Sequence, residues 1–290
     1  MELFAQVVVS GLTLGSLYAL VGLGFVVIYR ATGVVNFGHG EMLMLGAMTA
    51  LVLHVDMGLA FVFAFIIAVG GAGLLGAALE RIAYRPLRFA PVVTVILATV
   101  AVGQIIRAGV RLVRGSEVSR FPSPFSTEPF TVAGVTLTPA SIGITVTSIV
   151  LVLAFLLFFR RTRLGKGMQA TAQNREAATL VGVSIDHTFM LIWAIGSALA
   201  AVAGILLAPL IIITPDMGII GVKGFIGAIL GGFSSIPGAV AGCFLLGVIE
   251  NVGGVYVAGE MKDAIAFVVL LLVLFLRPQG LFGKPESKRA

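Results

Sequence analysis

Charged residues are scarce in this chain. Only 11% of its 290 residues are Asp, Glu, Lys or Arg, whereas an ordinary soluble domain carries about 25%. Hydrophobic residues make up 59% of the chain, and the mean hydropathy is +1.11. This composition excludes an ordinary soluble domain and indicates a protein that lies in a membrane.

Cysteine is almost absent, and histidine is rare. Cys243 is the single cysteine, which excludes an internal disulfide and a cysteine metal cluster. The histidines His39, His54 and His187 lie apart, and no H-E-x-x-H motif is present. We therefore expect no bound metal.

Sequence motifs for catalysis and nucleotide binding are also missing. The chain has no G-x-S-x-G elbow and no paired carboxylates at catalytic spacing. The GKG at 165–167 lacks the upstream glycine of a G-x-x-x-x-G-K-[ST] loop, so the chain cannot cradle ATP phosphates by that route. We expect no catalytic residue and no cofactor bound by this chain.

Long apolar runs are abundant. They extend over about 18–25 residues, long enough to cross a hydrocarbon core of about 30 Å, and they do not alternate apolar and polar residues as strands of a membrane barrel do. The sequence therefore predicts an all-α polytopic membrane protein with about 8–10 transmembrane helices, short and broken ones included. The first run carries Glu2 where a signal peptide has basic residues, so we expect a membrane helix there. The candidate spans are 4–29, 38–54, 58–79, 91–113, 140–159, 189–213, a glycine-interrupted region at 221–251, and 263–276.

The charges predict the orientation of these spans. Basic residues cluster in three connections, while the connections at 54–58 and 214–218 hold Asp56 and Asp216 and no Lys or Arg. The positive-inside rule places the basic connections in the cytoplasm and the acidic ones outside. An outside N-terminus and an inside C-terminus require an odd number of crossings, about nine if 221–251 crosses twice. Membrane orientation also explains the net charge of +6 better than nucleic acid binding does. The basic residues are Arg81, Arg85 and Arg88; Arg160, Arg161, Arg163, Lys166 and Arg175; and Arg277, Lys284, Lys288 and Arg289.

Two features belong to the predicted outer side. Arg107, Arg111 and Arg114 share one helix face at the outer end of a span. They either snorkel to the membrane interface or form a docking stripe for an acidic extracellular partner. Residues 115–139 form the long outer loop, whose alternating Thr and Val residues are compatible with a short hairpin.

The stretch NFGHGEMLMLGAM (36–48) interrupts the apolar sequence with glycines and polar residues. Irregular backbone in a membrane is tolerated only where protein covers it or where it lines a cavity. We predict a helix that opens near Gly40 and directs its N–H groups at a ligand, with Met42 and Met44 in an apolar wall. His39 either bonds a neighbouring carbonyl, lines the pathway, or serves in proton relay or metal binding. The candidate pathway residues here are Asn36, Phe37, Gly38, His39, Gly40 and Glu41.

A second interrupted segment, LGGFSSIPGAVAGCFLLGVIEN (230–251), lies in the other half of the chain. Paired interrupted segments point to a transport pathway, although small residues also serve close helix packing. Its candidate pathway residues are Phe233, Ser234, Ser235, Pro237 and Gly238. Further charges lie near the ends of spans, and we expect them to anchor the chain at the interface or to pair between subunits, with Lys223 a candidate for the pathway. They are Glu80, Lys223, Glu250 and Asp263.

The longest predicted cytoplasmic connection, 160–188, contains the sequence NREAA (174–178). Leu180 and Val181 follow as a short apolar patch, which ends at Gly182. We predict a short amphipathic helix suited to the groove of a partner; an ordinary interfacial connector is the alternative.

GKGMQATAQNREAATLVGV (165–183) is similar to the coupling-loop pattern of ABC importer permeases. NFGHGEMLMLGAM, GAILGGFSSIPGAVAGCFLLGVIEN (227–251) and RPQGLFG (277–283) resemble one narrower group, the LivH-type permease family of branched-chain amino acid ABC transporters. The resemblance covers essentially the whole chain. Met42, Leu43 and Met44 stand where aromatic residues are expected, and Gly38 stands where alanine is frequent, which leaves the substrate open. The coupling residues that the resemblance implies are Gly165, Gly167, Asn174, Glu176, Ala177, Ala178 and Gly182.

The resemblance implies one permease domain over 1–290, with the inverted-repeat architecture of importer permeases. Such a subunit carries branched-chain amino acids across a bacterial inner membrane into the cytoplasm. The implied partners are a homologous second permease subunit, two cytoplasmic ATPase subunits that use ATP and Mg, a periplasmic substrate-binding protein, and membrane lipid. The alternatives are a permease for urea, short amides or other small carboxylates, and a passive small-solute channel.

Overall fold

The computed structural model describes residues 2–283 except 116, 127 and 133. Three basic residues of the C-terminal cluster, Lys284, Lys288 and Arg289, lie outside the described residues. The described chain is mainly helical, and its two strands, β1 (Phe130–Val132) and β2 (Val135–Leu137), pair antiparallel as a small hairpin in the outer loop. The predicted all-α class and the hairpin are both confirmed.

Six helices in the described residues are long and apolar enough to cross a membrane. The shorter apolar helices α2, α9 and α11 raise the number of candidate membrane helices in the described residues to nine. This number lies within the predicted range of about 8–10. The six long helices are α1 (Glu2–Thr32), α3 (Phe61–Leu79, extended by a π-helical turn Glu80–Tyr84 and a 3-10 turn Arg85–Leu87), α4 (Val92–Arg114), α5 (Pro139–Arg161), α8 (Ile185–Leu207) and α10 (Ile236–Tyr256). The shorter helices are α2 (His39–Leu51, extended by a π-helical turn Val52–Asp56), α6 (Arg163–Gln173), α7 (Arg175–Leu180), α9 (Ile220–Gly231) and α11 (Lys262–Leu276), with 3-10 turns at Met217–Ile219 and Gly259–Met261.

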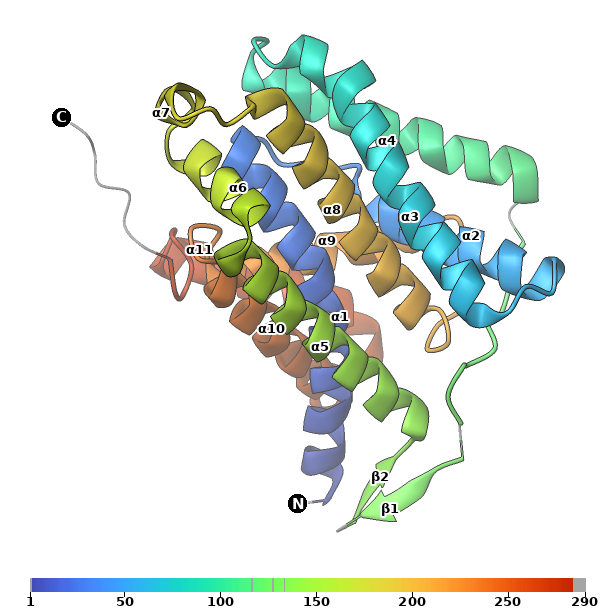
Figure 1. The fold of residues 1–290 in the computed structure, drawn as a ribbon. Helices are drawn as coiled ribbons and strands as arrows, with labels where there is room; N and C mark the ends of the chain where they lie inside the picture. Colours follow the sequence, from blue (N-terminus) through green and yellow to red (C-terminus); the bar gives the residue numbers. More distant parts are fainter. Residues whose placement is uncertain (1, 116, 127, 133, 284–290) are drawn as a thin grey trace.

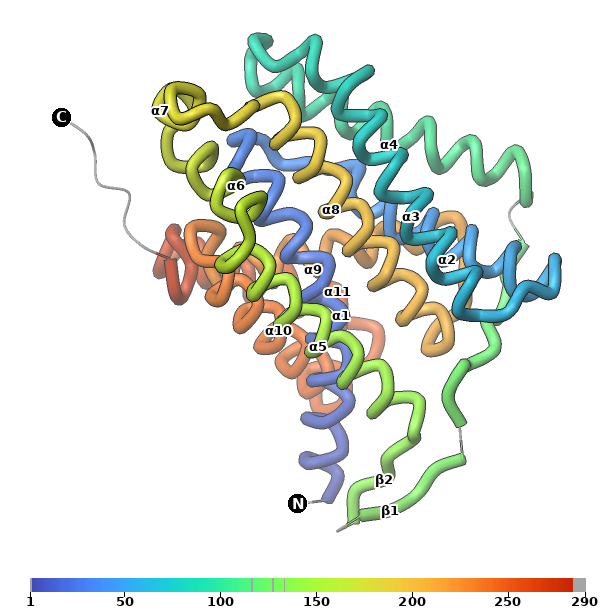
Figure 2. The backbone as a smooth tube through the Cα atoms, viewed as in Figure 1, coloured from blue at the N-terminus to red at the C-terminus, as the bar shows by residue number. Residues whose placement is uncertain are grey.

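Helix α1 lies at the centre of the bundle. It contacts α5, α8, α9 and α10, and its path between them can be followed in Figure 2. In the most apolar 18-residue stretch of α1, 89% of the residues are buried. The corresponding share in α4 is 17%, so α4 lies at the periphery. A Cβ at Gly15 would lie 2.7 Å from the Cα of Phe244, and one at Gly11 would lie 2.7 Å from the Cα of Val248. These glycines therefore serve close packing of α1 on α10, as small residues do between membrane helices.

The elements predicted outside and inside separate to different ends of the molecule (Figure 1). At one end the side chain of Gln6 donates to and accepts from the backbone of Thr136, at 2.7 Å in both bonds, and ties the N-terminus to the hairpin. Ser119 of the outer loop pairs with Ile213 of the connection after α8. At the other end, Arg88 and Asp186 of two predicted cytoplasmic segments form an ion pair.

Two predicted boundaries are wrong, each for a local reason. The span predicted at 189–213 is α8, which begins at Ile185 because Ser184 caps it and ends at Leu207, before Pro209. The predicted single helix in 160–188 is two helices. Asn174 separates them, because its extended backbone ends α6 while its side chain accepts from the N–H of Ala177 and caps α7.

Three of the charges near the span ends, Lys223, Glu250 and Asp263, find partners within this chain. Lys223 on α9 forms ion pairs with Glu250 of α10 at 2.5 Å and with Asp263 of α11 at 2.7 Å. The hydroxyl of Tyr18 on α1 also donates to Glu250, at 3.1 Å. This network joins four helices inside the bundle.

Candidate functional site

The first interrupted segment is a short irregular connection from α1 to α2. Helix α2 begins at His39, next to the predicted Gly40, and Gly38 is its N-cap. The side chain of Asn36 accepts from the N–H of Gly38 at 3.0 Å, and the N–H of Phe37 donates to the hydroxyl of Thr99 on α4 at 3.1 Å. The buried Asn36 side chain therefore holds this turn in place.

The start of α2 is enclosed by neighbouring backbone. A Cβ at Gly38 would lie 2.8 Å from the carbonyl oxygen of Thr99, and one at Gly40 would collide with the carbonyl of Gly218. The N–H groups of His39 and Glu41 donate to the carbonyls of Asn36 and Gly38 at 3.1 Å each. In this conformation these two N–H groups are engaged by the turn itself and are not free for a ligand.

His39 is fully buried in the bundle. Its ring lies 4.5 Å from that of Phe25 in an edge-on arrangement and packs against Gly24. Neither ring nitrogen has a hydrogen bond of normal geometry within the described residues, although the carbonyl of Val21 lies beside the ring. The described residues contain no group of His, Cys, Asp and Glu that could hold a metal.

Glu41 begins a row of ion pairs along the second half of α4, which is predicted to face outside. Arg107 pairs with Glu41, whose second carboxylate oxygen is buried without a partner in the described part of the chain. Arg111 pairs with Asp216 at 2.6 Å, between Nη2 and Oδ1. Arg114 pairs with Asp56 at the far end of α2. The arginine stripe is thus held by carboxylates of this chain, a role that the two sequence interpretations missed.

The second interrupted segment is the turn between α9 and α10. Ser235 caps α10 by accepting from the N–H of Gly238 at 3.1 Å, and Pro237 lies in the first helical turn, where its missing N–H has no cost. The segment after α11 packs against this turn and satisfies carbonyls at the end of α9. The N–H groups of Leu281 and Phe282 donate to the carbonyls of Leu230 and Gly231 at 2.8 and 3.0 Å.

A row of aromatic rings connects the two interrupted segments. The ring of Phe225, midway along α9, lies 5.7 Å from that of Phe37 and 5.6 Å from that of Phe233. The structure therefore brings both segments to one aromatic wall, while Met42 and Met44 are core residues. Sequence reasoning missed Phe225, which lies shortly before the second segment in the chain and is brought beside Phe37 only by the fold. A small hollow lies at one end of this wall, lined by Phe25, Phe37, Gly40, Gly218, Val222 and Phe225.

Segment 160–188, which is predicted to couple to an ATPase, places its apolar patch of Leu180 and Val181 outside the bundle. Ala178 is buried against the body of the protein, whereas Leu180 is 89% exposed and Val181 is 77% exposed. Gly182 ends the patch with a positive φ of 84°, a conformation that glycine adopts without steric cost. Gly165 lies close to the carbonyls of Phe158 and Phe159 and lets α6 fold back on α5.

Helix α7 is tied to the start of the first interrupted segment. The guanidinium of Arg175, the first residue of α7, donates to the carbonyls of Ala31 and Thr32 at 3.0 and 2.8 Å. These carbonyls belong to the last turn of α1. A displacement of α7 would therefore act on the connection that leads to Asn36 and α2.

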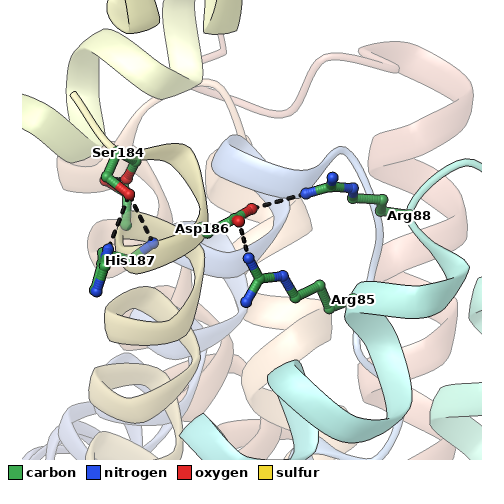
Figure 3. Close-up of polar contacts among 6 residues, drawn as sticks. Arg85, Arg88, Ser184, Asp186 and His187 are labelled. Atoms are coloured by element: carbon green, nitrogen blue, oxygen red, sulfur yellow. Dashed lines mark hydrogen bonds and ion pairs between the residues drawn. The ribbon is translucent and has the colours of Figure 1, made fainter. Parts of the chain in front are cut away.

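A second tie joins the turn after α3 to the start of α8. Figure 3 shows Arg85 and Arg88 directed at the carboxylate of Asp186, and Ser184 directed at His187. The distance from Arg88 Nη1 to Asp186 Oδ1 is 2.7 Å, and that from Ser184 Oγ to His187 Nδ1 is 2.9 Å. The ends of α3 and α8 that are predicted to face the cytoplasm are thus linked beside α7.

Comparison with known proteins shows relatives along nearly the full length. The chain is 35% identical to the high-affinity branched-chain amino acid transport system permease protein LivH of Escherichia coli K12, covering 99% of this chain and 97% of the relative. It is also 35% identical to the permease protein BraD of Pseudomonas aeruginosa, covering 99% and 98%. A probable LivH of Methanocaldococcus jannaschii is 26% identical over 94% of this chain and 90% of the relative.

A solved structure shares the fold. PsaBC from Streptococcus pneumoniae in complex with Fab matches with a TM-score of 0.53 and 14% identity, covering 95% of this chain and 92% of that one. The family model described as branched-chain amino acid transport system / permease component matches residues 7–274. With this match and the 35% identical relatives, the chain belongs to the family of branched-chain amino acid transport permease components.

Proposed function

We propose that this chain is the permease subunit of an ABC importer that carries branched-chain amino acids across a bacterial inner membrane into the cytoplasm. The observation that carries the proposal is the identity of 35% to LivH over 99% of this chain. Relatives of this kind support a transport role rather than an enzymatic one. The six long apolar helices fit a multi-pass membrane subunit.

The energy for import enters through separate ATPase subunits, because the sequence has no phosphate-binding loop of the G-x-x-x-x-G-K-[ST] type. The exposed pair Leu180 and Val181 at the end of α7 supplies an apolar surface for such a partner. From there, Arg175 connects α7 to the end of α1. The complete importer contains a homologous second permease, two ATPases that bind ATP and Mg, and a periplasmic substrate-binding protein.

The substrate passes along the aromatic wall that joins the two interrupted segments. Phe37, Phe225 and Phe233 provide an apolar surface for an aliphatic side chain. Burying a leucine side chain there contributes about 1.5–3 kcal/mol, which permits passage without trapping. High affinity then belongs to the binding protein, since a tight site in the permease would slow release.

The decisive experiment is reconstitution in lipid vesicles with the partner subunits and the binding protein. We expect ATP-dependent accumulation of radiolabelled leucine. Replacing Glu176, Ala177 and Ala178 together should abolish accumulation and ATPase co-purification, whereas Glu260→Ala, an exposed change outside the coupling segment, should preserve both. Conduction of solute without ATP or a binding protein would refute the importer and favour a passive channel.

The substrate is tested on the binding protein by thermal-shift screening. Stabilisation by leucine, isoleucine and valine supports the proposal. Stabilisation by urea or a short amide alone would refute the choice of substrate while leaving the importer role in place.

A further inference from the structure

A cavity lies at the cytoplasmic end of the molecule, away from the aromatic wall. It has a volume of about 280 Å³ and is lined by the end of α1, the turns after α3, the start of α4, α7 and α8. Binding pockets for small molecules typically occupy about 300–1,000 Å³. The cavity lies near the lower end of this range, a size that suits a ligand as small as an amino acid.

One wall of this cavity carries an unpaired buried carboxylate. Glu80 is 3% exposed, and its Oε2 has no hydrogen-bond partner within the described residues. In that part of the chain no Lys or Arg nitrogen lies within ion-pair distance of it either. Burying a charged group without a partner is costly, so Glu80 is suited to receive a cationic group from a ligand.

The same cavity is lined by guanidinium groups that retain free donors. Arg88 uses Nη1 for Asp186, and Arg175 uses Nη2 for the carbonyls of Ala31 and Thr32. A guanidinium has five N–H donors, in a geometry that matches a carboxylate. Both arginines can therefore bind an anionic group while keeping their present contacts.

Apolar rings complete the lining. Tyr84 and Trp193 stack with their ring centroids 4.3 Å apart, and Phe189 lies under the guanidinium of Arg175 at 5.1 Å. The cavity thus offers an anionic group, cationic groups and an apolar surface, which are the three partners of an amino acid with a hydrophobic side chain.

We propose that this cavity is a cytoplasm-facing binding site for a free zwitterionic amino acid, with its ammonium group on Glu80 and its carboxylate on Arg88 and Arg175. The choice of a hydrophobic amino acid rests on the proposed function. Because Arg175 belongs to α7, an amino acid in the cavity contacts the segment that receives the ATPase. Occupancy by cytoplasmic substrate is therefore coupled to the position of α7.

The site is tested on the purified permease–ATPase complex in nanodiscs, without the binding protein, by equilibrium dialysis with radiolabelled leucine. We expect saturable binding that Glu80→Gln and Arg88→Gln each weaken about 10- to 100-fold, the range for a hydrogen bond to a charged group. The matched controls are Glu260→Gln and Arg120→Gln, exposed residues that do not line the cavity and lie outside segment 160–188, and they should bind as the unaltered complex does. Isoamylamine and 4-methylpentanoate, which each lack one charged group, should compete at least tenfold less well than leucine.

Absence of saturable leucine binding, or equal binding by Glu80→Gln and Arg88→Gln variants that elute as intact complexes, would overturn the proposal. Retention of phosphatidylethanolamine by the unaltered complex but not by Glu80→Gln, without leucine binding, would overturn it in favour of a lipid headgroup. Uptake in vesicles with the binding protein separates the two proposals. Normal import without cavity binding refutes only this site, and cavity binding without ATP-dependent import refutes the proposed function.

Discussion

Replacing Lys223 with methionine should strongly destabilise the bundle, because it leaves Glu250 buried beside no cation. Glu250 is 3% exposed at its side chain, and its Oε1 lies 2.5 Å from Lys223 Nζ. Removing one partner of a buried ion pair costs about 3–5 kcal/mol. The lower end applies here, since the hydroxyl of Tyr18 still donates to Glu250.

The same structure predicts the effects of two further substitutions. Lys223→Met/Glu250→Gln removes both charges and keeps a hydrogen-bond partner for Tyr18, so its cost should stay within about 1 kcal/mol. Asp263→Asn should cost about 0–1 kcal/mol, because the Asp263 side chain is 75% exposed and its ion pair is screened by solvent.

The measurement is thermal unfolding of the detergent-purified protein at one heating rate. At about 2–4 °C per kcal/mol, Lys223→Met should lower the apparent Tm by roughly 6–12 °C, and the double variant should recover most of that loss. Equal losses in the single and double variants would refute the stranded-charge reasoning. Full stability with abolished uptake in the double variant would instead assign Lys223 to the pathway.

Further predictions concern packing, capping and coupling. Gly40→Ala should destabilise the protein by about 1–3 kcal/mol, because its Cβ meets the carbonyl of Gly218; Gly70→Ala, in open space on α3, should be neutral or stabilising in the same unfolding assay. Leu180→Glu should reduce ATPase co-purification severalfold without shifting the apparent Tm, since this side chain is exposed; retained co-purification would contradict the docking role of α7. Asn174→Ala should cost about 1 kcal/mol of local stability by removing the cap of α7, measured as faster amide exchange over Arg175–Leu180.

Much of this protein is determined by properties that act locally along the chain. Apolar runs predict membrane helices because hydropathy adds over neighbouring residues, and six long helices confirm it. The start of α2 next to Gly40 and the end of the α7 patch at Gly182 follow from glycine and capping signals within a few residues. Asn174 shows the limit of such reasoning, since one residue both ends α6 and begins α7.

The tertiary structure alone decides which distant charges and rings meet. Arg111 pairs with Asp216, and Lys223 joins Glu250 and Asp263, although nothing in the local sequence specifies these partners. Phe225 connects the two interrupted segments because α9 lies between them. Within the described residues, one carboxylate oxygen of Glu80 has no partner beside a cavity that several helices line. Hydropathy and capping depend on near neighbours in the chain, whereas ion pairs, ring contacts and cavities depend on how the helices pack against one another.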